Sequence, residues 1–305
     1  MSMTVREILS LGEKQLIQSG IEDATRDSKS LYCYLIGIPE GKLFMEYQYK
    51  LQDILCDQYF DLVDRRAAGE PLQYIVGTQE FMGLTFKVDP RVLIPRMDTE
   101  VLVENALSII NSGTLAGQGA RLTAERDAWE VLDLCTGSGA IGISVARLSE
   151  SQPIANVKVT LSDISEDALS VARENIKLNE VGDIVKAVRG DLFSPFKKLF
   201  RKQKFDMILS NPPYVKSGDI VTLQKEIREH EPMNALDGGE DGLDFYRRIA
   251  EEAPSYLTSG GVILMEIGDS QGEEVREIFR GWKTQVLQDL GGRDRVVFAL
   301  YEEDN

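Results

Sequence analysis

The chain has 305 residues, which suggests about two domains, and 43% of them are hydrophobic, which is enough for a packed core. It carries 34 Lys and Arg residues against 50 Asp and Glu residues, and this balance disfavours a protein built mainly to grip duplex DNA. His230 is the single histidine, so the sequence excludes a metal site built from several histidines and favours a structural role for this residue.

The three cysteines are Cys33, Cys56 and Cys135, and they form no Cys-x-x-Cys pair. We therefore expect no zinc cluster or other metal site and no disulfide framework, and we expect a cytoplasmic protein. The N-terminal segment is amphipathic and charged, which predicts no secretory signal. No apolar run approaches the length of about 18 residues that a membrane span needs, so we expect no membrane association.

Residues 1–71 predict a small helical bundle. Apolar side chains in Leu51–Ala68 recur at three- and four-residue steps, and Pro71 then prevents the helix from continuing. Similar stripes run through Val5–Ile17 and Ser28–Ile36. Each stripe places apolar residues on one helix face, as in a bundle.

Residues 72–95 predict a β-hairpin linker. Three of its stretches are rich in β-formers and are separated by Gly and Pro, namely Gln73–Val76, Phe81–Val88 and Val92–Pro95. We expect this linker to connect the bundle to a larger domain.

Residues 96–305 alternate strand and helix patterns and predict an α/β domain. Helix spacing is clear in Glu166–Leu178, and the tail from Lys283 to Tyr301 predicts a terminal hairpin. Such alternation indicates a mostly parallel sheet covered on both faces. The expected strands are Glu130–Leu134, Val157–Ser162, Ile184–Val188, Phe205–Leu209 and Gly261–Ile267.

Two segments of this domain differ from their surroundings in composition. Residues 111–128 are polar and rich in Gly and Ala, which predicts a surface loop. Phe196–Lys204 holds five basic residues in an acidic chain. A solvated loop is the simplest interpretation of this basic segment, and the alternative hypothesis is that it grips an acidic protein partner or bound RNA.

A glycine-rich turn follows the first expected strand of the α/β domain. Gly137, Gly139 and Gly142 match Gly-x-Gly-x-x-Gly, and Asp163 ends the next strand about 20 residues further on. Glycines let the backbone approach a ligand, the following helix offers free N–H groups, and the carboxylate can accept hydrogen bonds from ribose hydroxyls. Taken alone, this pattern fits NAD and S-adenosylmethionine (SAM) equally.

Acidic residues near this turn favour SAM. Asp133 ends the first strand, where a fixed negative charge disfavours an anionic pyrophosphate but suits the ammonium and sulfonium cations of SAM. Asp191 follows the third strand, where it would face an adenine, with Leu192 packing on the base. Taken alone, Asp191 and Leu192 could each equally be an ordinary loop residue.

The fourth strand ends in Asn211-Pro212-Pro213-Tyr214. Ligands bind at the carboxyl ends of parallel strands, and the two prolines remove backbone donors there. The Asn211 side-chain oxygen and the Pro212 carbonyl remain as acceptors for a planar NH2 group, and Tyr214 can cover the face of that group. The turn therefore predicts a site that holds an amide or an exocyclic amine.

These motifs resemble the class I SAM-dependent methyltransferases and, within them, the PrmC/HemK family of peptide chain release factor glutamine methyltransferases. Two departures from the family pattern occur: Cys135 replaces a usual Gly, and Met97-Asp98 stands where Pro-Glu is common. The resemblance covers nearly the whole chain and extends to Gln73–Gly77, Val92–Arg96, Glu231-Pro232, Ala235–Gly239, Asp241–Asp244, Glu266–Gly268 and Gly292–Val296.

The resemblance implies a Rossmann-like seven-stranded sheet, an N-terminal bundle that docks the partner, and a monomer. It implies transfer of the SAM methyl group to the glutamine of the Gly-Gly-Gln motif in release factors. The glutamine would contact Asn211, Pro212, Pro213 and Tyr214, with possible support from Arg96 and Glu231. The cofactor would contact Asp133, Cys135, Thr136, Gly137, Ser138, Gly139, Asp163, Ile164, Asp191, Leu192 and Asn211.

Three other functions compete with this interpretation. Adenine N6 methylation of DNA uses the same acceptor turn, but it requires base flipping, and we find no target-recognition insertion in this acidic chain. An NAD-dependent oxidoreductase would leave the Asn-Pro-Pro-Tyr turn unexplained. A translation-factor-binding module without catalysis is disfavoured by the intact acceptor turn.

Overall fold

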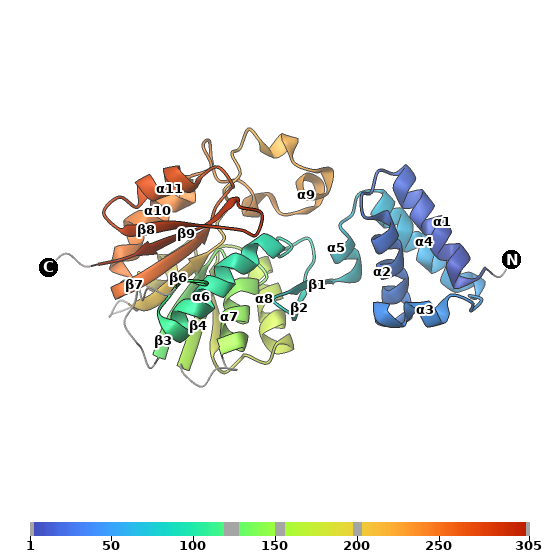
Figure 1. Ribbon diagram of the computed structural model, residues 1–305, viewed down its shortest axis with the longest axis horizontal. Helices are drawn as coiled ribbons and strands as arrows, with labels where there is room; N and C mark the ends of the chain where they lie inside the picture. Colours follow the sequence, from blue (N-terminus) through green and yellow to red (C-terminus); the bar gives the residue numbers. More distant parts are fainter. Residues whose placement is uncertain (1–2, 119–127, 150–155, 198–202, 303–305) are drawn as a thin grey trace. The chain divides into compact units, whose positions relative to one another are not determined.

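The computed structural model describes residues 3–118, 128–149, 156–197 and 203–302. The chain forms two compact units (Figure 1). The first comprises Met1–Thr78 and Gln224–His230, and the second comprises Gln79–Leu223 and Glu231–Asn305. The division at residues 72 and 96 that the sequence suggested stays a prediction.

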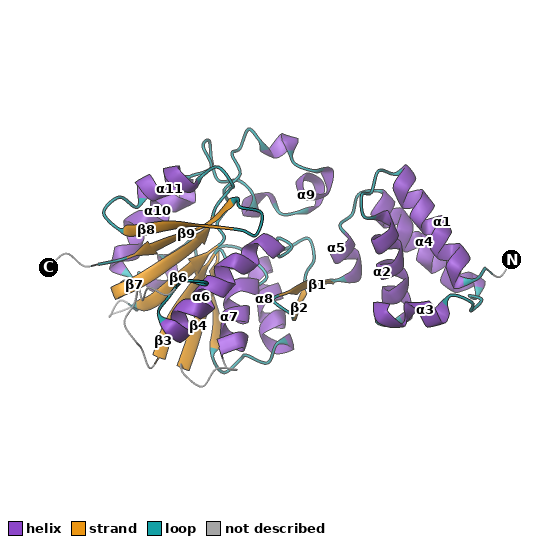
Figure 2. Cartoon of the chain, in the orientation of Figure 1, coloured by secondary structure: helices purple, strands orange, loops and turns teal. Residues whose placement is uncertain are grey.

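The first unit is helical in the part that the structure describes (Figure 2), as the apolar stripes predicted. Thr4 begins α1 with a capping box, because its side chain accepts from the Glu7 N–H and the Glu7 carboxylate accepts from the Thr4 N–H. The α-helices are α1 (Val5–Gln18), α2 (Ala24–Ile36), α3 (Leu43–Glu46), α4 (Asp53–Ala67), α5 (Leu72–Val76) and α9 (Lys225–His230).

A buried ion cluster joins three helices of the first unit. Arg66 on α4 donates from Nε to Asp27 Oδ2 on α2 at 2.7 Å, and its Nη2 lies 2.8 Å from Glu226 Oε1 on α9. The Arg66 and Asp27 side chains are each less than a tenth exposed. Because a buried guanidinium requires charged partners, this cluster fixes α9 within the unit.

The expected strand at Gln73–Val76 is wrong, since these residues belong to the helix α5. Leu72, Ile75 and Val76 have helical spacing and pack on the core of the first unit. Gly77 ends the helix with a φ of 75°, a conformation that glycine adopts readily. The β-branched residues Ile75 and Val76 favoured a strand, and a helix of five residues gives too few repeats for its spacing to be recognised.

A hairpin follows, formed by β1 (Thr78–Phe81) and β2 (Leu84–Lys87). Met82 and Gly83 connect the strands, and both have positive φ, as a tight hairpin turn requires. The third β-rich stretch, Val92–Pro95, is irregular and not a strand. Prolines at positions 90 and 95 remove N–H donors on both sides of this stretch.

The second unit is built on a seven-stranded sheet in the order β5-β4-β3-β6-β7-β9-β8 (Figure 1). The first five strands of this order run parallel, and β9 pairs antiparallel with both β7 and β8. The parallel sheet and the terminal hairpin are thus confirmed. The strands are β3 (Ala128–Leu134), β4 (Asn156–Asp163), β5 (Val185–Arg189), β6 (Phe205–Ser210), β7 (Leu257–Glu266), β8 (Lys283–Gln288) and β9 (Asp294–Leu300).

Helices cover both faces of this sheet. Val131 of β3 packs on the side of α6 (Glu100–Ser112), α7 (Ala140–Ser149) and α8 (Glu166–Leu178). Leu132, the next residue, packs on the side of α10 (Asp244–Glu252) and α11 (Gly272–Ile278). This alternation is the period of a strand buried on both faces, and it produces two apolar layers.

The strand order reverses beside β3. The chain proceeds outward from β3 through β4 to β5 and then returns to place β6 on the other side of β3. Such a reversal leaves a crevice at the carboxyl ends of the two central strands, where open α/β sheets bind ligands.

Parts of both compositionally distinct segments, 111–128 and 196–204, lie outside the described residues. At the ends of the basic segment, Lys197 pairs with Glu252 at 2.7 Å and Lys204 donates to the Leu257 carbonyl at 2.8 Å. Within the described part of the chain, we find no helix with the length and hydropathy that crossing a bilayer requires.

Candidate active site

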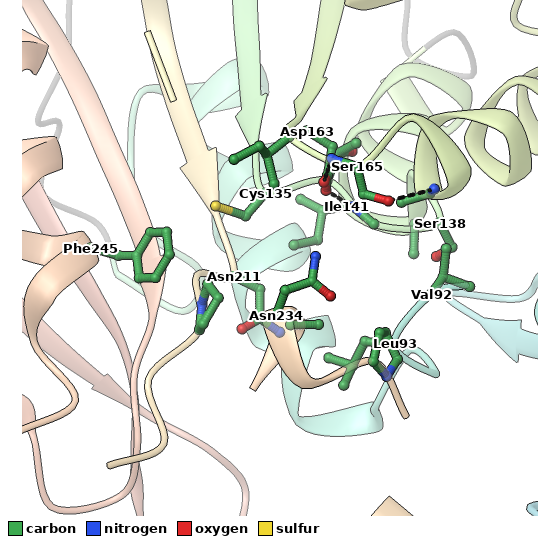
Figure 3. Close-up of a pocket in the computed structure, with 18 of the residues that line it drawn as sticks. Val92, Leu93, Cys135, Ser138, Ile141, Asp163, Ser165, Asn211, Asn234 and Phe245 are labelled. Atoms are coloured by element: carbon green, nitrogen blue, oxygen red, sulfur yellow. Dashed lines mark hydrogen bonds between the residues drawn. The ribbon is translucent and has the colours of Figure 1, made fainter. Parts of the chain in front are cut away.

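A cavity of about 390 Å³ opens at the carboxyl ends of β3, β4 and β6 (Figure 3). Its volume lies in the range of small-molecule sites, about 300–1,000 Å³. Polar and apolar residues share its wall. The lining includes Val92, Leu93, Arg96, Thr99, Cys135, Thr136, Gly137, Ser138, Ile141, Asp163, Ile164, Asp191, Leu192, Asn211, Pro213, Asn234, Phe245 and Arg248.

The glycine-rich turn forms one side of the cavity. It leads from β3 into α7, and Gly137 and Gly139 have φ values of 54° and 84°. Cys135 also has a positive φ, 56°, in a region where non-glycine residues are strained by about 1–2 kcal/mol. This explains why a glycine is usual at the position of Cys135.

Asp133 lies beneath the turn, and it is not among the residues that line the cavity. Its side chain is fully buried, and its Oδ2 accepts from Thr136 Oγ1 at 2.6 Å and from the Gly142 N–H at 3.0 Å. Burial raises the pKa of this carboxyl to about 7. The contacts assign Asp133 to shaping the turn, and the structure gives it no direct place on the cavity wall.

Asp163, at the end of β4, faces both the turn and the cavity (Figure 3). Its Oδ2 accepts from the Gly137 N–H and its Oδ1 accepts from the Ser165 N–H, both at 2.9 Å. Burial raises the pKa of Asp163 above its ordinary value. The carboxylate therefore fixes the turn and still has lone pairs for a ligand hydroxyl.

Asp191 and Leu192 follow β5 and line the same cavity. Asp191 Oδ2 accepts from Arg248 Nη2 of α10 at 2.6 Å. Leu192 is 4% exposed and takes a positive φ of 46°. Together with Phe245 of α10, Leu192 provides the cavity with apolar surface that suits a planar ring.

The Asn-Pro-Pro-Tyr turn follows β6. Asn211 and Pro213 line the cavity, and Pro212 and Tyr214 do not. The Tyr214 hydroxyl instead donates to Glu266 Oε1 at 3.3 Å. Burial raises the pKa of Tyr214 well above its ordinary value, so its hydroxyl remains a donor. The structure therefore brings the Asn211 amide to the same cavity as the glycine-rich turn.

Behind Asn211 lies a buried polar pair. Asn211 Nδ2 donates to Thr99 Oγ1 at 3.4 Å, and Thr99 Oγ1 donates to Glu266 Oε2 at 2.5 Å. Thr99 and Glu266 are 4% and 2% exposed. Glu266 belongs to a motif named in the sequence analysis and Thr99 does not, and no local pattern shows that residues of η2 (Met97–Thr99) and β7 meet beneath Asn211.

Arg96 and Glu231 form an ion pair at the cavity. The Glu231 side chain is almost fully buried, at 1% exposure, and the Arg96 side chain is partly exposed. The pairing joins the irregular segment after β2 to the segment that follows α9. The ion pair fixes these two side chains to each other, and their contact with a substrate stays a prediction.

Several cavity residues were missed by sequence reasoning. Val92 and Leu93 lie on one wall, and Phe245 and Asn234 lie on others (Figure 3). Asn234 lies between the motifs Glu231-Pro232 and Ala235–Gly239, and this proximity was the signal that could have identified it as a cavity residue. Phe245 had none, because an aromatic residue on an amphipathic helix usually packs in a core.

Two family models match parts of this chain. The PrmC N-terminal domain model matches residues 7–77, and the methyltransferase small domain model matches residues 120–240. The second match spans the glycine-rich turn and the Asn-Pro-Pro-Tyr turn. Among solved structures, the hMettl16 catalytic domain in complex with a MAT2A 3'UTR hairpin has a TM-score of 0.51 and 14% identity, covering 80% of this chain and 83% of that one. This similarity supports the fold alone.

Curated relatives align along almost the whole chain. A release factor glutamine methyltransferase from Clostridium acetobutylicum is 36% identical over 301 residues, 98% of this chain and 99% of the relative. Proteins of the same name from Geobacter sulfurreducens and Moorella thermoacetica are 39% and 35% identical, covering 96% and 99% of this chain and 95% and 100% of theirs. The fold, the two family matches and these relatives together show that the chain belongs to the family of release factor glutamine methyltransferases.

Proposed function

We propose that this protein transfers a methyl group from SAM to the side-chain amide nitrogen of glutamine in the Gly-Gly-Gln motif of peptide chain release factors. The observation that carries the proposal is the shared cavity. The Asn211 amide and the residues Cys135 to Ser138 of the glycine-rich turn, which lie 73 to 76 residues before it in the chain, line the same cavity of about 390 Å³.

The residues around the cavity fit SAM. The Asp163 carboxylate can accept hydrogen bonds from ribose hydroxyls, and Leu192 and Phe245 offer apolar surface for an adenine. Gly137 lines the cavity and carries no side chain that would block the approach of a ligand. Gly139 does not line the cavity, and a β-carbon at this position would come within 2.8 Å of Ile143 in the core. When bound, SAM would supply an electrophilic methyl group attached to a sulfonium.

The chain's own residues would then position the nucleophile. An amide nitrogen is a weak nucleophile because its lone pair is delocalised into the carbonyl. Asn211 Oδ1, on the cavity wall, is an acceptor that could hold one N–H group of the amide and orient the nitrogen toward the methyl group. The family resemblance adds the Pro212 carbonyl as the second acceptor, although Pro212 itself does not line the cavity. The proton can leave after the nitrogen is alkylated, so positioning and electrostatics account for most of the catalysis.

The sharpest test is a mass spectrum of the Gly-Gly-Gln peptide after a release factor is incubated with SAM and the enzyme. We expect a gain of one CH2 group on glutamine. In Asn211→Ala, turnover should fall by roughly 100- to 1000-fold, by analogy with losing one positioned polar group. Asn156→Ala is a matched control, because Asn156 is exposed and lies at the amino end of β4, whereas the cavity lies at the carboxyl ends of the strands.

Near-normal methylation by Asn211→Ala would refute the role of this residue. Label from SAM that appeared on duplex DNA and not on release factor would favour adenine methylation instead. Titration with SAM and with NAD separates the remaining alternative, because only the true cofactor should raise thermal stability at sub-millimolar concentration. Bound SAM without methylation of any release factor would favour a docking module.

A further inference from the structure

Asn211 can serve as an acceptor only if its amide group faces the cavity with the oxygen. The two ends of an asparagine side chain have nearly the same shape, so packing alone does not choose between them. The orientation therefore depends on the hydrogen-bond partner at the other end. In this protein that partner is the Thr99 hydroxyl, 3.4 Å from Asn211 Nδ2.

A threonine hydroxyl has one proton to donate. Thr99 directs that proton to Glu266 Oε2 at 2.5 Å, a length typical of a hydroxyl donating to an ionised carboxylate. With its proton committed, the Thr99 oxygen can only accept a further hydrogen bond. Asn211 must then present its NH2 group to Thr99, which leaves Oδ1 for the cavity.

Besides Thr99, four other groups face Glu266, as hydrogen-bond donors or as charges. Tyr214 donates to Oε1 at 3.3 Å, and the Tyr246 hydroxyl of α10 donates to the Glu266 backbone carbonyl at 2.8 Å. Arg295 of β9 faces the carboxylate with a positive charge, and Asp98 of η2 opposes ionisation but is itself paired with Arg295 at 3.1 Å.

Burial is the largest influence on Glu266 and raises its pKa to about 6. At neutral pH the group is therefore ionised and accepts from Thr99. Below pH 6 it gains a proton and can donate to Thr99, which would free the Thr99 hydroxyl to donate to Asn211 Oδ1. That reversal would turn the NH2 group of Asn211 toward the cavity.

We propose that Thr99 and Glu266 are positioning residues, which hold the Asn211 amide with its oxygen toward the substrate. The inference rests on the proposed function for the identity of the substrate, but the orientation of Asn211 can be observed without any substrate.

The kinetic test uses Thr99→Val, which removes the hydroxyl at nearly constant volume. We expect kcat to fall by roughly 10- to 100-fold, the scale of a misplaced binding group, while KM for SAM stays unchanged. Thr99→Ser, which keeps the hydroxyl, should restore most of kcat. In an Asn211→Ala background, Thr99→Val should cause no further loss, because the group that it positions is absent.

A structural defect would give a different pattern. If Thr99→Val acted by loosening the fold, its loss would persist in the Asn211→Ala background, and that result would overturn the inference. Glu266→Gln supplies the second readout. We expect kcat of the wild type to fall below about pH 6, and Glu266→Gln should lack this fall because it has no proton to gain in that range.

The third readout needs no substrate. In protein labelled with 15N-asparagine, the side-chain NH2 signals of Asn211 can be assigned by their loss in Asn211→Ala. We expect them to shift in Thr99→Val, and to shift between pH 7 and 5 in the wild type but not in Glu266→Gln. If the wild type fails to methylate release factor, the proposed function fails and these signals decide the inference. If the Asn211 NH2 signals shift neither in Thr99→Val nor between pH 7 and 5, the inference is overturned.

Discussion

The carboxylate of Asp163 has two tasks that one substitution can separate. Its oxygens accept from the N–H groups of Gly137 and Ser165, each at 2.9 Å, and it faces the cavity. Asp163→Asn keeps the shape but replaces one acceptor by an NH2 donor. One of the two N–H groups then loses its acceptor, which destabilises the fold by about 1–3 kcal/mol.

The same change weakens SAM binding if Asp163 holds the ribose. Losing a charge-assisted hydrogen bond amounts to about 1.5–3 kcal/mol, so the Kd for SAM should rise roughly 10- to 100-fold. Urea unfolding without ligand measures the first effect, and calorimetric titration with SAM measures the second.

Asp191→Asn is the matched control for Asp163→Asn. Asp191 lines the same cavity, but its side chain is 46% exposed and pairs with Arg248, whose side chain is 41% exposed. Exposed pairs contribute little, so its free energy of unfolding should change by less than about 1 kcal/mol. If Asp163→Asn bound SAM within about twofold of wild type, a change of only about 0.4 kcal/mol, the assignment of Asp163 to the ribose would be wrong.

Three further predictions concern the glycine-rich turn. The free energy of unfolding of Cys135→Gly should lie within about 1 kcal/mol of that of wild type, because relief of the strained φ offsets the greater conformational freedom of glycine in the unfolded chain. Cys135→Val should instead lose about 2 kcal/mol or more. Equal stability of the two variants in urea would contradict this prediction. Gly142→Ala should lower the free energy of unfolding by about 1–3 kcal/mol in the same assay, because the added β-carbon would overlap Leu161 and approach Asp133 Oδ2 to 3.0 Å. An unchanged urea midpoint would show that the neighbouring side chains move to accommodate the β-carbon. Burial raises the pKa of Asp133 to about 7 from an ordinary 3.8, so between these pH values the folded state binds a proton that the unfolded state lacks. Lowering the pH from 7 toward 4 should therefore raise the free energy of unfolding of wild type relative to that of Asp133→Asn. A difference in this free energy that stays constant over the pH range would refute the prediction.

The sheet was predictable because its central strands are buried on both faces and carry apolar runs, as in Met207–Leu209 of β6. The glycine-rich turn and the Asn-Pro-Pro-Tyr turn were predictable for another reason: each is a local pattern at the end of such a strand. The short helix α5 was missed, because five residues give too few repeats to separate helix from strand periodicity.

The pair behind Asn211 could not be predicted from spacing. Thr99 and Glu266 are 167 residues apart, and their meeting depends on β7 lying next to β6 in the sheet. Likewise, the position of Asp133 beneath the turn follows from its Oδ2 accepting from Thr136 and from the Gly142 N–H in the first turn of α7, which a sequence pattern does not encode. Both kinds of contact are visible only in the folded chain.

The ion cluster around Arg66 has a consequence for dissecting the protein. Because α9 belongs to the first unit, the chain enters that unit, leaves it after Thr78, and returns for Gln224–His230. A protease that nicked the backbone near Thr78 would therefore not release the N-terminal part, since Glu226 would still grip Arg66. A fragment beginning at Gln79 would carry α9, a helix of six residues with no buried side chain, without Arg66, which pairs with Glu226. Separate expression of the chain before and after Thr78 would therefore divide the first unit between two fragments. Co-expression of the two fragments would be needed to rebuild that unit by complementation.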